Sequence, residues 1–332
     1  MIVNHMFCRG LRGLMLGTAL SFLMTSTHAE PQTFPNGNTP IRLVLPFAAG
    51  GGSDVLARLL APKIEEQIGA SVIVENRTGA GGAIGASHVA KSKPDGHTAL
   101  VTVTSLIQAP HLIAEIPYDP IKDFEPVQLI ARVSTAFIVR GDLPVNSMAE
   151  FIELIKREPN RHSIGNYGIG TLSNIQGAVL VQQAGLDAVE VAYQGAPPLA
   201  NAIMSGEVSG AFTDIQSSLP LVETGRLKIL GVTGTEPVPV LPDAPVLDQQ
   251  GYENLNLYGW IGVFVPKGTP EEITKRLADS LRKALDEPEI RERLLAMSFI
   301  PGDLTQEEFA SMVKEDYHTW GELIRNANIK LH

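Results

Sequence analysis

Residues 41–58, IRLVLPFAAGGGSDVLAR, carry the strongest indication of the fold. The stretch opens with an apolar run at 41–45, which is typical of a short buried strand and is ended by Pro46. Three glycines at 50–52 follow, and apolar residues then recur at helical spacing over 53–68. A strand, a glycine-rich turn and a helix in this order predict the first part of a β–α–β unit, and therefore an α/β fold.

The same alternation of strand and helix continues through the chain. Further strands are predicted at 72–74, 98–103, 137–139, 163–164, 189–191, 211–212, 229–230 and 261–265. Helices are predicted from the glycines at 79–82 to about 90, at 147–156, and in three stretches after 265, with proline-rich connections at 117–126 and 237–245. A chain of 332 residues with this pattern is long enough for two cores, each on a mostly parallel sheet flanked by helices.

Composition narrows the class of protein. The chain is 44% hydrophobic and 19% charged, which is the composition of a globular protein. Its net charge is −10 and it has no basic tract, so nucleic acid is not a predicted partner. A single cysteine excludes a disulfide framework and a cysteine zinc site. Histidines are scattered, and H-E-x-x-H and G-x-S-x-G motifs are absent, so we predict no metal, no cofactor and no catalytic residue.

The N-terminal segment is typical of an exported protein. Arg9 and Arg12 precede an apolar run at 14–24, and small and polar residues ending at Ala29 follow. The run is too short to cross a membrane, which takes about 20 helical residues. We therefore predict that 1–29 is a signal peptide cleaved after Ala29. The mature chain then contains no cysteine, which suits an oxidising compartment such as the periplasm.

Glycine-rich loops connect predicted strands to predicted helices repeatedly. They lie at 46–54, 79–82, 165–173 and, more weakly, 193–197. Glycine lets backbone N–H groups approach a ligand closely, and a helix N-terminus adds unpaired donors and the positive end of a dipole. Such loops bind anions without Lys or Arg at the carboxyl ends of strands. A single loop of this kind is best interpreted as a tight turn. The repetition of such loops favours the interpretation as a binding site for a carboxylate or phosphate.

Two local patterns have competing interpretations. The run GAGGAIG at 79–85 lacks the register of G-x-G-x-x-G, and 75–78 separates it from the preceding strand, which argues against a dinucleotide site. Asp54 and Arg58 stand four residues apart at a helix start. An ion pair that also complements the helix dipole is the favoured interpretation, and ligand contact by Asp54 is the alternative.

The motifs, taken together, resemble one family. PFAAGGGSDVLAR at 46–58 resembles the P-F-x-x-G-G-x-x-D-x-x-A-R signature of the tripartite tricarboxylate transporter receptors, the Bug family. Later landmarks of that family are matched in order by NRTGAGG at 76–82, YDP at 118–120, KDF at 122–124, GIGT at 168–171, GRLK at 225–228, LPDAP at 241–245, GW at 259–260 and PKGTP at 266–270. The resemblance extends over nearly the whole mature chain.

The resemblance implies a two-lobed periplasmic binding protein of the type with two crossover strands. One lobe would hold 30–131 plus 259–332, the other 132–258, and the ligand would lie in the cleft between them. The protein would be a monomeric receptor, not an enzyme, and would deliver a small organic carboxylate to one large and one small integral membrane subunit. A sensor that presents its ligand to a membrane signalling protein, and a periplasmic enzyme on the same fold, remain as alternatives.

Family ligands are carboxylates held by loop N–H groups, hydroxyls and bridging waters. Carried onto this sequence, and combined with the glycine loops, this predicts a site without an obligatory arginine. The predicted ligand-binding residues are Phe47, Ala48, Gly51, Gly52, Ser53, Gly81, Gly82, Ala83, Thr104, Ser105, Gly170, Thr171, Ser173, Asn174, Tyr193, Gly195 and Asp214.

The chain departs from the family pattern at three places. Ala202 stands where the fourth motif usually has an acid, and Asn174 where a histidine is frequent. The usual F-D pair is Phe212-Thr213 here, with Asp214 one place later. These departures bear on the identity of the ligand, which the sequence does not name, more than on the fold.

Overall fold

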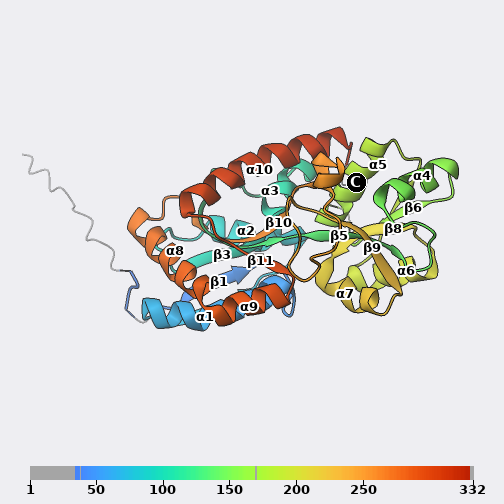
Figure 1. The fold of residues 1–332 in the computed structure, drawn as a ribbon. Helices are drawn as coiled ribbons and strands as arrows, with labels where there is room; N and C mark the ends of the chain where they lie inside the picture. The colour runs from blue at the N-terminus through green and yellow to red at the C-terminus, as the bar shows by residue number, and fades with distance from the viewer. Residues whose placement is uncertain (1–33, 38, 169, 330–332) are drawn as a thin grey trace, which may run out of the picture. The chain divides into compact units, whose positions relative to one another are not determined.

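Two β-sheets, called sheet A and sheet B below, organise the chain in the computed structural model (Figure 1). The structure describes residues 34–37, 39–168 and 170–329, and the predicted signal peptide at 1–29 lies outside them. Sheet A runs in the order β11 (Phe299–Pro301), β4 (Phe124–Val133), β10 (Gly259–Pro266), β3 (Thr98–Val103), β1 (Ile41–Leu45) and β2 (Val72–Asn76). Sheet B runs in the order β7 (Val189–Ala192), β6 (Ser163–Asn166), β8 (Gly210–Asp214), β5 (Thr135–Arg140) and β9 (Leu227–Val232).

Both sheets are mixed, although four of the six strands of sheet A and four of the five strands of sheet B run in one direction, and the predicted α/β fold class is confirmed. In sheet A, β1 is parallel to β2 and β3, whereas β10 is antiparallel to β3 and β4. In sheet B, β6 is parallel to β7 and β8, whereas β5 is antiparallel to β8 and β9. The strands β5 and β10 are the ones at which the chain enters each sheet from the other: β4 of sheet A leads through Ser134 into β5, and β10 is the first strand of sheet A after β9 of sheet B.

Helices cover both faces of sheet A. On one face lie α1 (Gly52–Ile68), α8 (Glu271–Asp286) and α9 (Pro288–Ala296), and on the other α2 (Ala83–Ala90), α3 (Ser105–Leu112) and α10 (Gln306–Asn326) (Figure 1). Successive side chains of a strand point to opposite faces. Leu43 and Leu45 of β1 are therefore buried in the cluster that contains α1 and α8, while Val44 belongs to the cluster of α2 and α3.

Sheet B is covered in the same way. Helices α4 (Met148–Arg157) and α5 (Leu172–Ala184) lie on one face, and α6 (Ala196–Ser205) and α7 (Ile215–Glu223) on the other (Figure 1). Phe137 of β5 packs edge-on against Phe151 and Phe212, with ring centroids 4.9 Å and 5.0 Å away. Within the described ranges, the helices lack the combination of length and apolarity needed to span a membrane.

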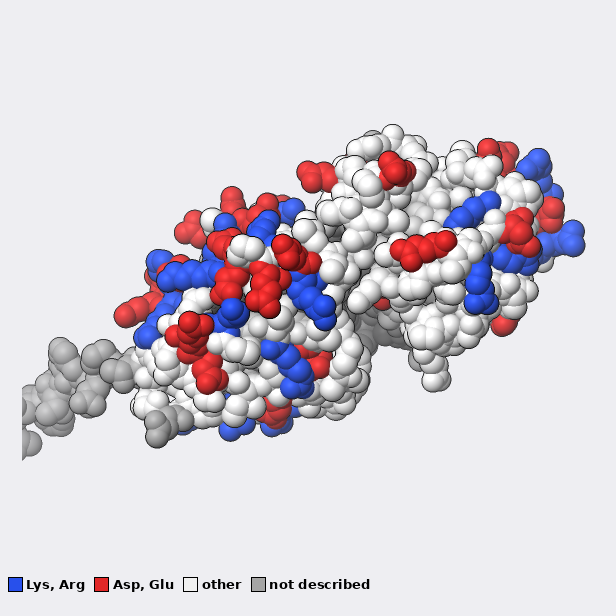
Figure 2. Space-filling model, turned by 60° about the horizontal axis from the view of Figure 1, so that its bottom comes forward, with Lys and Arg blue, Asp and Glu red and all other residues white. Residues whose placement is uncertain are grey.

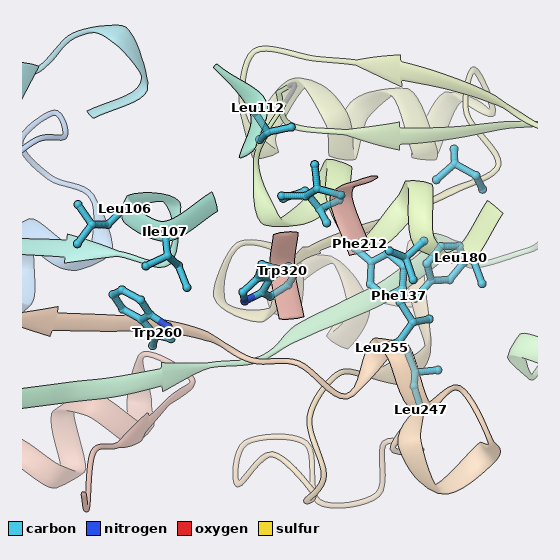
Figure 3. Packing of buried hydrophobic residues seen from close by; sticks show 14 of the residues in the cluster. Leu106, Ile107, Leu112, Phe137, Leu180, Phe212, Leu247, Leu255, Trp260 and Trp320 are labelled. Atoms are coloured by element: carbon cyan, nitrogen blue, oxygen red, sulfur yellow. The ribbon is translucent and has the colours of Figure 1, made fainter. Parts of the chain in front are cut away.

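One hydrophobic cluster links the two sheets. It includes Ile107 of α3, Trp260 of β10 in sheet A and Phe212 of β8 in sheet B. Trp320 of α10 lies between these groups in the close view (Figure 3). Trp320 is 1% exposed. Burial of large aromatic side chains contributes strongly to stability. This shared cluster therefore stabilises the packing of the two sheets near the loops described below.

Candidate ligand-binding cavity

A cavity of about 570 Å³ is lined by residues from both sheets. The loops after β1, β2 and β3, the helix α3 and the start of β10 form its sheet A wall. The loop after β6 and the start of α7 form its sheet B wall. Val133 and Ser134, at the passage from β4 to β5, and the segment Met297 to Phe299 complete the lining. Its volume lies within the range of small-molecule sites, which is about 300–1,000 Å³.

Ten of the seventeen predicted residues line this cavity. They are Phe47, Gly51, Gly52, Ser53, Gly81, Thr104, Ser105, Gly170, Thr171 and Asp214. The other seven are outside the lining: Ala48, Gly82, Ala83, Ser173, Asn174, Tyr193 and Gly195.

Several of these seven residues instead hold the loops in place. Ser173 is fully buried and donates its hydroxyl proton to the Phe212 carbonyl oxygen at 2.6 Å. The Asn174 side chain accepts a hydrogen bond from the Gly170 N–H at 3.0 Å and donates one to Glu190 at 2.7 Å. These bonds shape the loop whose other residues reach the cavity.

Gly82 and Ala83 are buried behind the cavity. Gly82 has a φ of 101°, and a Cβ atom there would lie 3.3 Å from the Pro46 Cβ. On the far side, Tyr193 donates its hydroxyl proton to Glu207 at 2.9 Å, and Gly195 begins α6 with a φ of 104°. Ala48 is exposed. Gly82 and Gly195 thus allow the backbone conformation of their loops and do not line the cavity.

Four helices begin at the cavity. The N-cap residues of α1, α3, α5 and α7 are Gly51, Thr104, Thr171 and Asp214, and all four line it. Among the described residues, no side chain of an N-cap residue caps α1, α3 or α7. The Ile107 N–H in the first turn of α3 donates to the Thr104 carbonyl oxygen at 3.0 Å, and the other N–H groups of these first turns are left for solvent or a ligand. With the positive ends of the helix dipoles, these donors favour an anion in the cavity.

The hydroxyl of Thr171 is already engaged within its own loop. It donates to the Gly168 carbonyl oxygen at 2.6 Å and accepts a hydrogen bond from the Asn174 N–H at 3.4 Å. Thr104 differs, because its oxygen accepts from the Trp260 N–H at 2.7 Å and its proton stays free to donate. The sheet A wall therefore offers the freer hydroxyl donor.

Sequence reasoning missed several polar side chains of the lining, and three of them are buried without a hydrogen-bond partner among the described residues. Gln108, Ser134 and Ser298 are only 1%, 2% and 6% exposed. The Gln108 amide nitrogen and both serine hydroxyls are without a hydrogen-bond partner among the described residues. Because buried polar groups in proteins are almost always paired, these three atoms are candidates for hydrogen bonds to a ligand or to ordered water.

Ser298 also has an unusual backbone conformation. Its φ of 61° is rare for a residue other than glycine, and such strain gathers at functional sites. The conformation follows from tertiary structure, so no sequence motif reveals it. Gln108 and Ser134 lie outside the glycine loops from which the site was predicted.

Full charges are scarce in the lining. Among the described residues that form it, Asp214 is the only Asp or Glu, and Lys, Arg and His are absent. Tyr167 donates its hydroxyl proton to Asp214 at 3.4 Å. Burial raises the pKa of the Asp214 carboxyl, and this hydrogen bond opposes the rise.

On the face drawn in Figure 2, basic and acidic side chains are interspersed, without a large patch of one sign.

The predicted ion pair of Asp54 and Arg58 is confirmed. Arg58 donates to Asp54 at 3.0 Å, and the Gly50 N–H and the Asn76 amide donate to the same carboxylate at 2.9 Å each. The Arg58 hydrogen bond lowers the pKa of Asp54 to about 2, against the effect of burial. Asp54 is therefore an anion that fixes the glycine loop 46–54 from behind.

Metal ligation lacks support in the described part of the chain, where no three or more His, Cys, Asp or Glu side chains come together. Apolar side chains fill much of the lining instead, among them Val103, Val133 and Leu172. The arrangement suits an anion with a hydrocarbon body.

Comparison with known proteins agrees with this geometry. Residues 56–329 match the model of the family described as tripartite tricarboxylate transporter family receptor. The chain belongs to this family. The receptor is 32% identical over 317 residues to a UPF0065 protein from the tcbD–tcbE intergenic region of a Pseudomonas species, covering 95% of the receptor and 94% of that protein. The resemblance predicted from the motifs is thus confirmed, and the family is one of receptors, not of enzymes.

Two solved structures place the receptor among periplasmic binding proteins. The periplasmic binding protein BugD is 33% identical, with a TM-score of 0.73, over 88% of the receptor and 99% of BugD. A Rhodopseudomonas palustris protein solved with adipate is 30% identical, with a TM-score of 0.77, over 88% of the receptor and 99% of that chain. The predicted periplasmic binding protein fold is confirmed by these similarities.

Proposed function

We propose that the receptor binds a small organic carboxylate in the cavity between its sheets and delivers it to the large and small integral subunits of a tripartite tricarboxylate-type transporter. The observation that carries this proposal is the set of uncapped helix N-termini around a cavity whose described lining contains no basic side chain. An anion is the ligand that such termini favour. The adipate in a relative is a carboxylate of suitable size.

The proposal includes export and two lobes. It takes 1–29 as a signal peptide cleaved after Ala29, and the mature chain as a periplasmic monomer. It assigns 30–131 plus 259–332 to one lobe and 132–258 to the other. In support, only Ser134 separates the sheet A strand β4 from the sheet B strand β5. Since both sheets contribute to the lining, hinge closure over the ligand would complete the site.

A thermal-shift screen tests the carboxylate. The purified protein, freed of bound ligand by unfolding and refolding, is heated with linear and aromatic mono-, di- and tricarboxylates, with phosphate and neutral sugars as other classes. A carboxylate at a hundred times its Kd stabilises the folded state by about 2.7 kcal/mol and raises Tm. The proposal is wrong if phosphate or a sugar raises Tm and no carboxylate does.

A pair of serine variants shows whether the cavity is the site. Ser134 and Ser280 are both buried, with hydroxyls that lack a partner among the described residues, and only Ser134 lines the cavity. Ser134→Ala should weaken the carboxylate found in the screen about tenfold, while Ser280→Ala leaves its Kd unchanged. Equal effects of the two variants would mean that the carboxylate binds elsewhere.

A further inference from the structure

The two walls of the cavity differ in charge. The sheet A wall supplies hydrogen-bond donors and carries no charged side chain among the described residues: the uncapped N-termini of α1 and α3 and the amide of Gln108. The sheet B wall also contains an uncapped helix start, that of α7, but it carries Asp214, the only Asp or Glu of the described lining, with Tyr167 beside it. A ligand that contacts both walls therefore meets uncharged donors at one end and a carboxylate at the other.

Asp214 is not saturated by the protein. Although it is the N-cap residue of α7, its side chain makes no capping hydrogen bond. Among the described residues it accepts one long bond, from Tyr167 at 3.4 Å. Asp54 differs from Asp214, because three different groups of the protein donate hydrogen bonds to its carboxylate at 2.9–3.0 Å. Such saturation is expected of an aspartate with a structural role.

We propose that the ligand carries one carboxylate, bound at the sheet A wall, and a hydrogen-bond donor at its other end, a hydroxyl or an ammonium group, bound by Asp214. Asp214 thereby excludes ligands with a second carboxylate at that end. This inference rests on the proposed function and specifies which carboxylates fulfil it.

The exclusion follows from electrostatics. Two carboxylates that face each other repel, and the described lining offers no Lys, Arg or His to separate them. Burial also raises the pKa of Asp214, because its anion lacks the donors that water would supply. A hydroxyl or ammonium group of the ligand provides such a donor. Val103, Val133 and Leu172 accommodate the apolar part between the two ends.

Calorimetric titration with length-matched acids tests the inference. Linear acids of four to eight carbons are used in four forms: unsubstituted, ω-hydroxy, ω-amino and dicarboxylate. At the best chain length, the ω-hydroxy or the ω-amino acid should bind at least tenfold more tightly than the dicarboxylate, and the preferred form identifies the donor.

Asp214→Asn provides the second readout. It should strengthen the dicarboxylate at least tenfold and weaken the ω-amino acid at least tenfold, while the ω-hydroxy acid changes less because the amide oxygen still accepts. Asp187→Asn, which removes an exposed acid outside the cavity, serves as the control. If Asp214→Asn does not fold, the inference is judged from the affinities of the unmodified protein for the four forms of acid.

The outcomes separate the two proposals. A dicarboxylate that binds as tightly as the ω-hydroxy and ω-amino acids overturns the role of Asp214 and leaves the carboxylate receptor intact. An Asp214→Asn variant with unchanged preferences also overturns it. Failure of all four forms at every length to bind overturns the inference, and it contradicts the proposed function as well only if no carboxylate raises Tm in the thermal-shift screen.

Discussion

Replacement of Gln108 by methionine should change stability and affinity in opposite senses. Gln108 lies in α3, is 1% exposed, and its amide nitrogen has no partner among the described residues. An unsatisfied buried polar group costs about 1–3 kcal/mol. Methionine is similarly long, unbranched and a good helix former. We therefore expect Gln108→Met to raise the free energy of unfolding of the empty protein by about 1 kcal/mol.

The same variant should bind carboxylate more weakly. A hydrogen bond to a charged group contributes about 1.5–3 kcal/mol, and 1.4 kcal/mol corresponds to tenfold in Kd. The expected loss is thus about 10- to 150-fold. Urea unfolding of the ligand-free protein gives the first quantity, and calorimetric titration with the carboxylate found by thermal shift gives the second.

Gln176→Met is the matched control. Gln176 is also buried with an unpartnered amide nitrogen, but it lies outside the lining and its oxygen accepts from Thr135 at 2.7 Å. This variant should lose stability and keep its affinity. If Gln108→Met behaves like the control, the Gln108 amide supports the fold and does not bind the ligand.

Three further outcomes follow from the same geometry. Trp260 donates to Asp316 at 3.0 Å, and burial raises the pKa of Asp316 to about 6 from 3.8. The folded protein therefore retains that proton between these values, so its free energy of unfolding should fall by up to about 3 kcal/mol as pH rises through this window. Urea unfolding at several pH values should show a flatter profile for Asp316→Asn; an unchanged profile would exclude Asp316 as the source. Gly82→Val should lower Tm more than Gly82→Ala, because a branched side chain is strained at a φ of 101°. Arg77, which pairs with Glu75 at 2.6 Å and lies outside the cavity lining, should tolerate alanine with less than about twofold change in Kd, whereas a loss above tenfold would indicate an arginine clamp.

The fold was predictable wherever local sequence determines local structure. The glycine turn at 50–52 lies between a strand and a helix, as predicted, and the helix begins at Gly52. Strand β4 was missed and partly assigned to a proline-rich connection. It contains Pro126 and the polar Gln128, and it is held by β10 and β11, which lie far along the chain. Long-range pairing of this kind has no local pattern to reveal it.

The site was predictable in part for the same reason. Glycine loops located the N-termini of α1 and α5, because a helix start is a local property. They did not separate residues that line the cavity, such as Thr171, from residues that support the loop, such as Ser173. Gln108 and Ser298 reach the cavity only through tertiary structure, so their place in the lining required coordinates.

The position of the carboxylate in a crystal structure of the complex would be the most direct measurement. The carboxylate that binds most tightly in solution is the ligand for that structure. We predict that its oxygens lie about 2.7–3.2 Å from backbone nitrogens in the first turns of α1 and α3, without contact to a basic side chain. A carboxylate held by Lys or Arg, or bound outside the cavity, would contradict binding by helix N-termini.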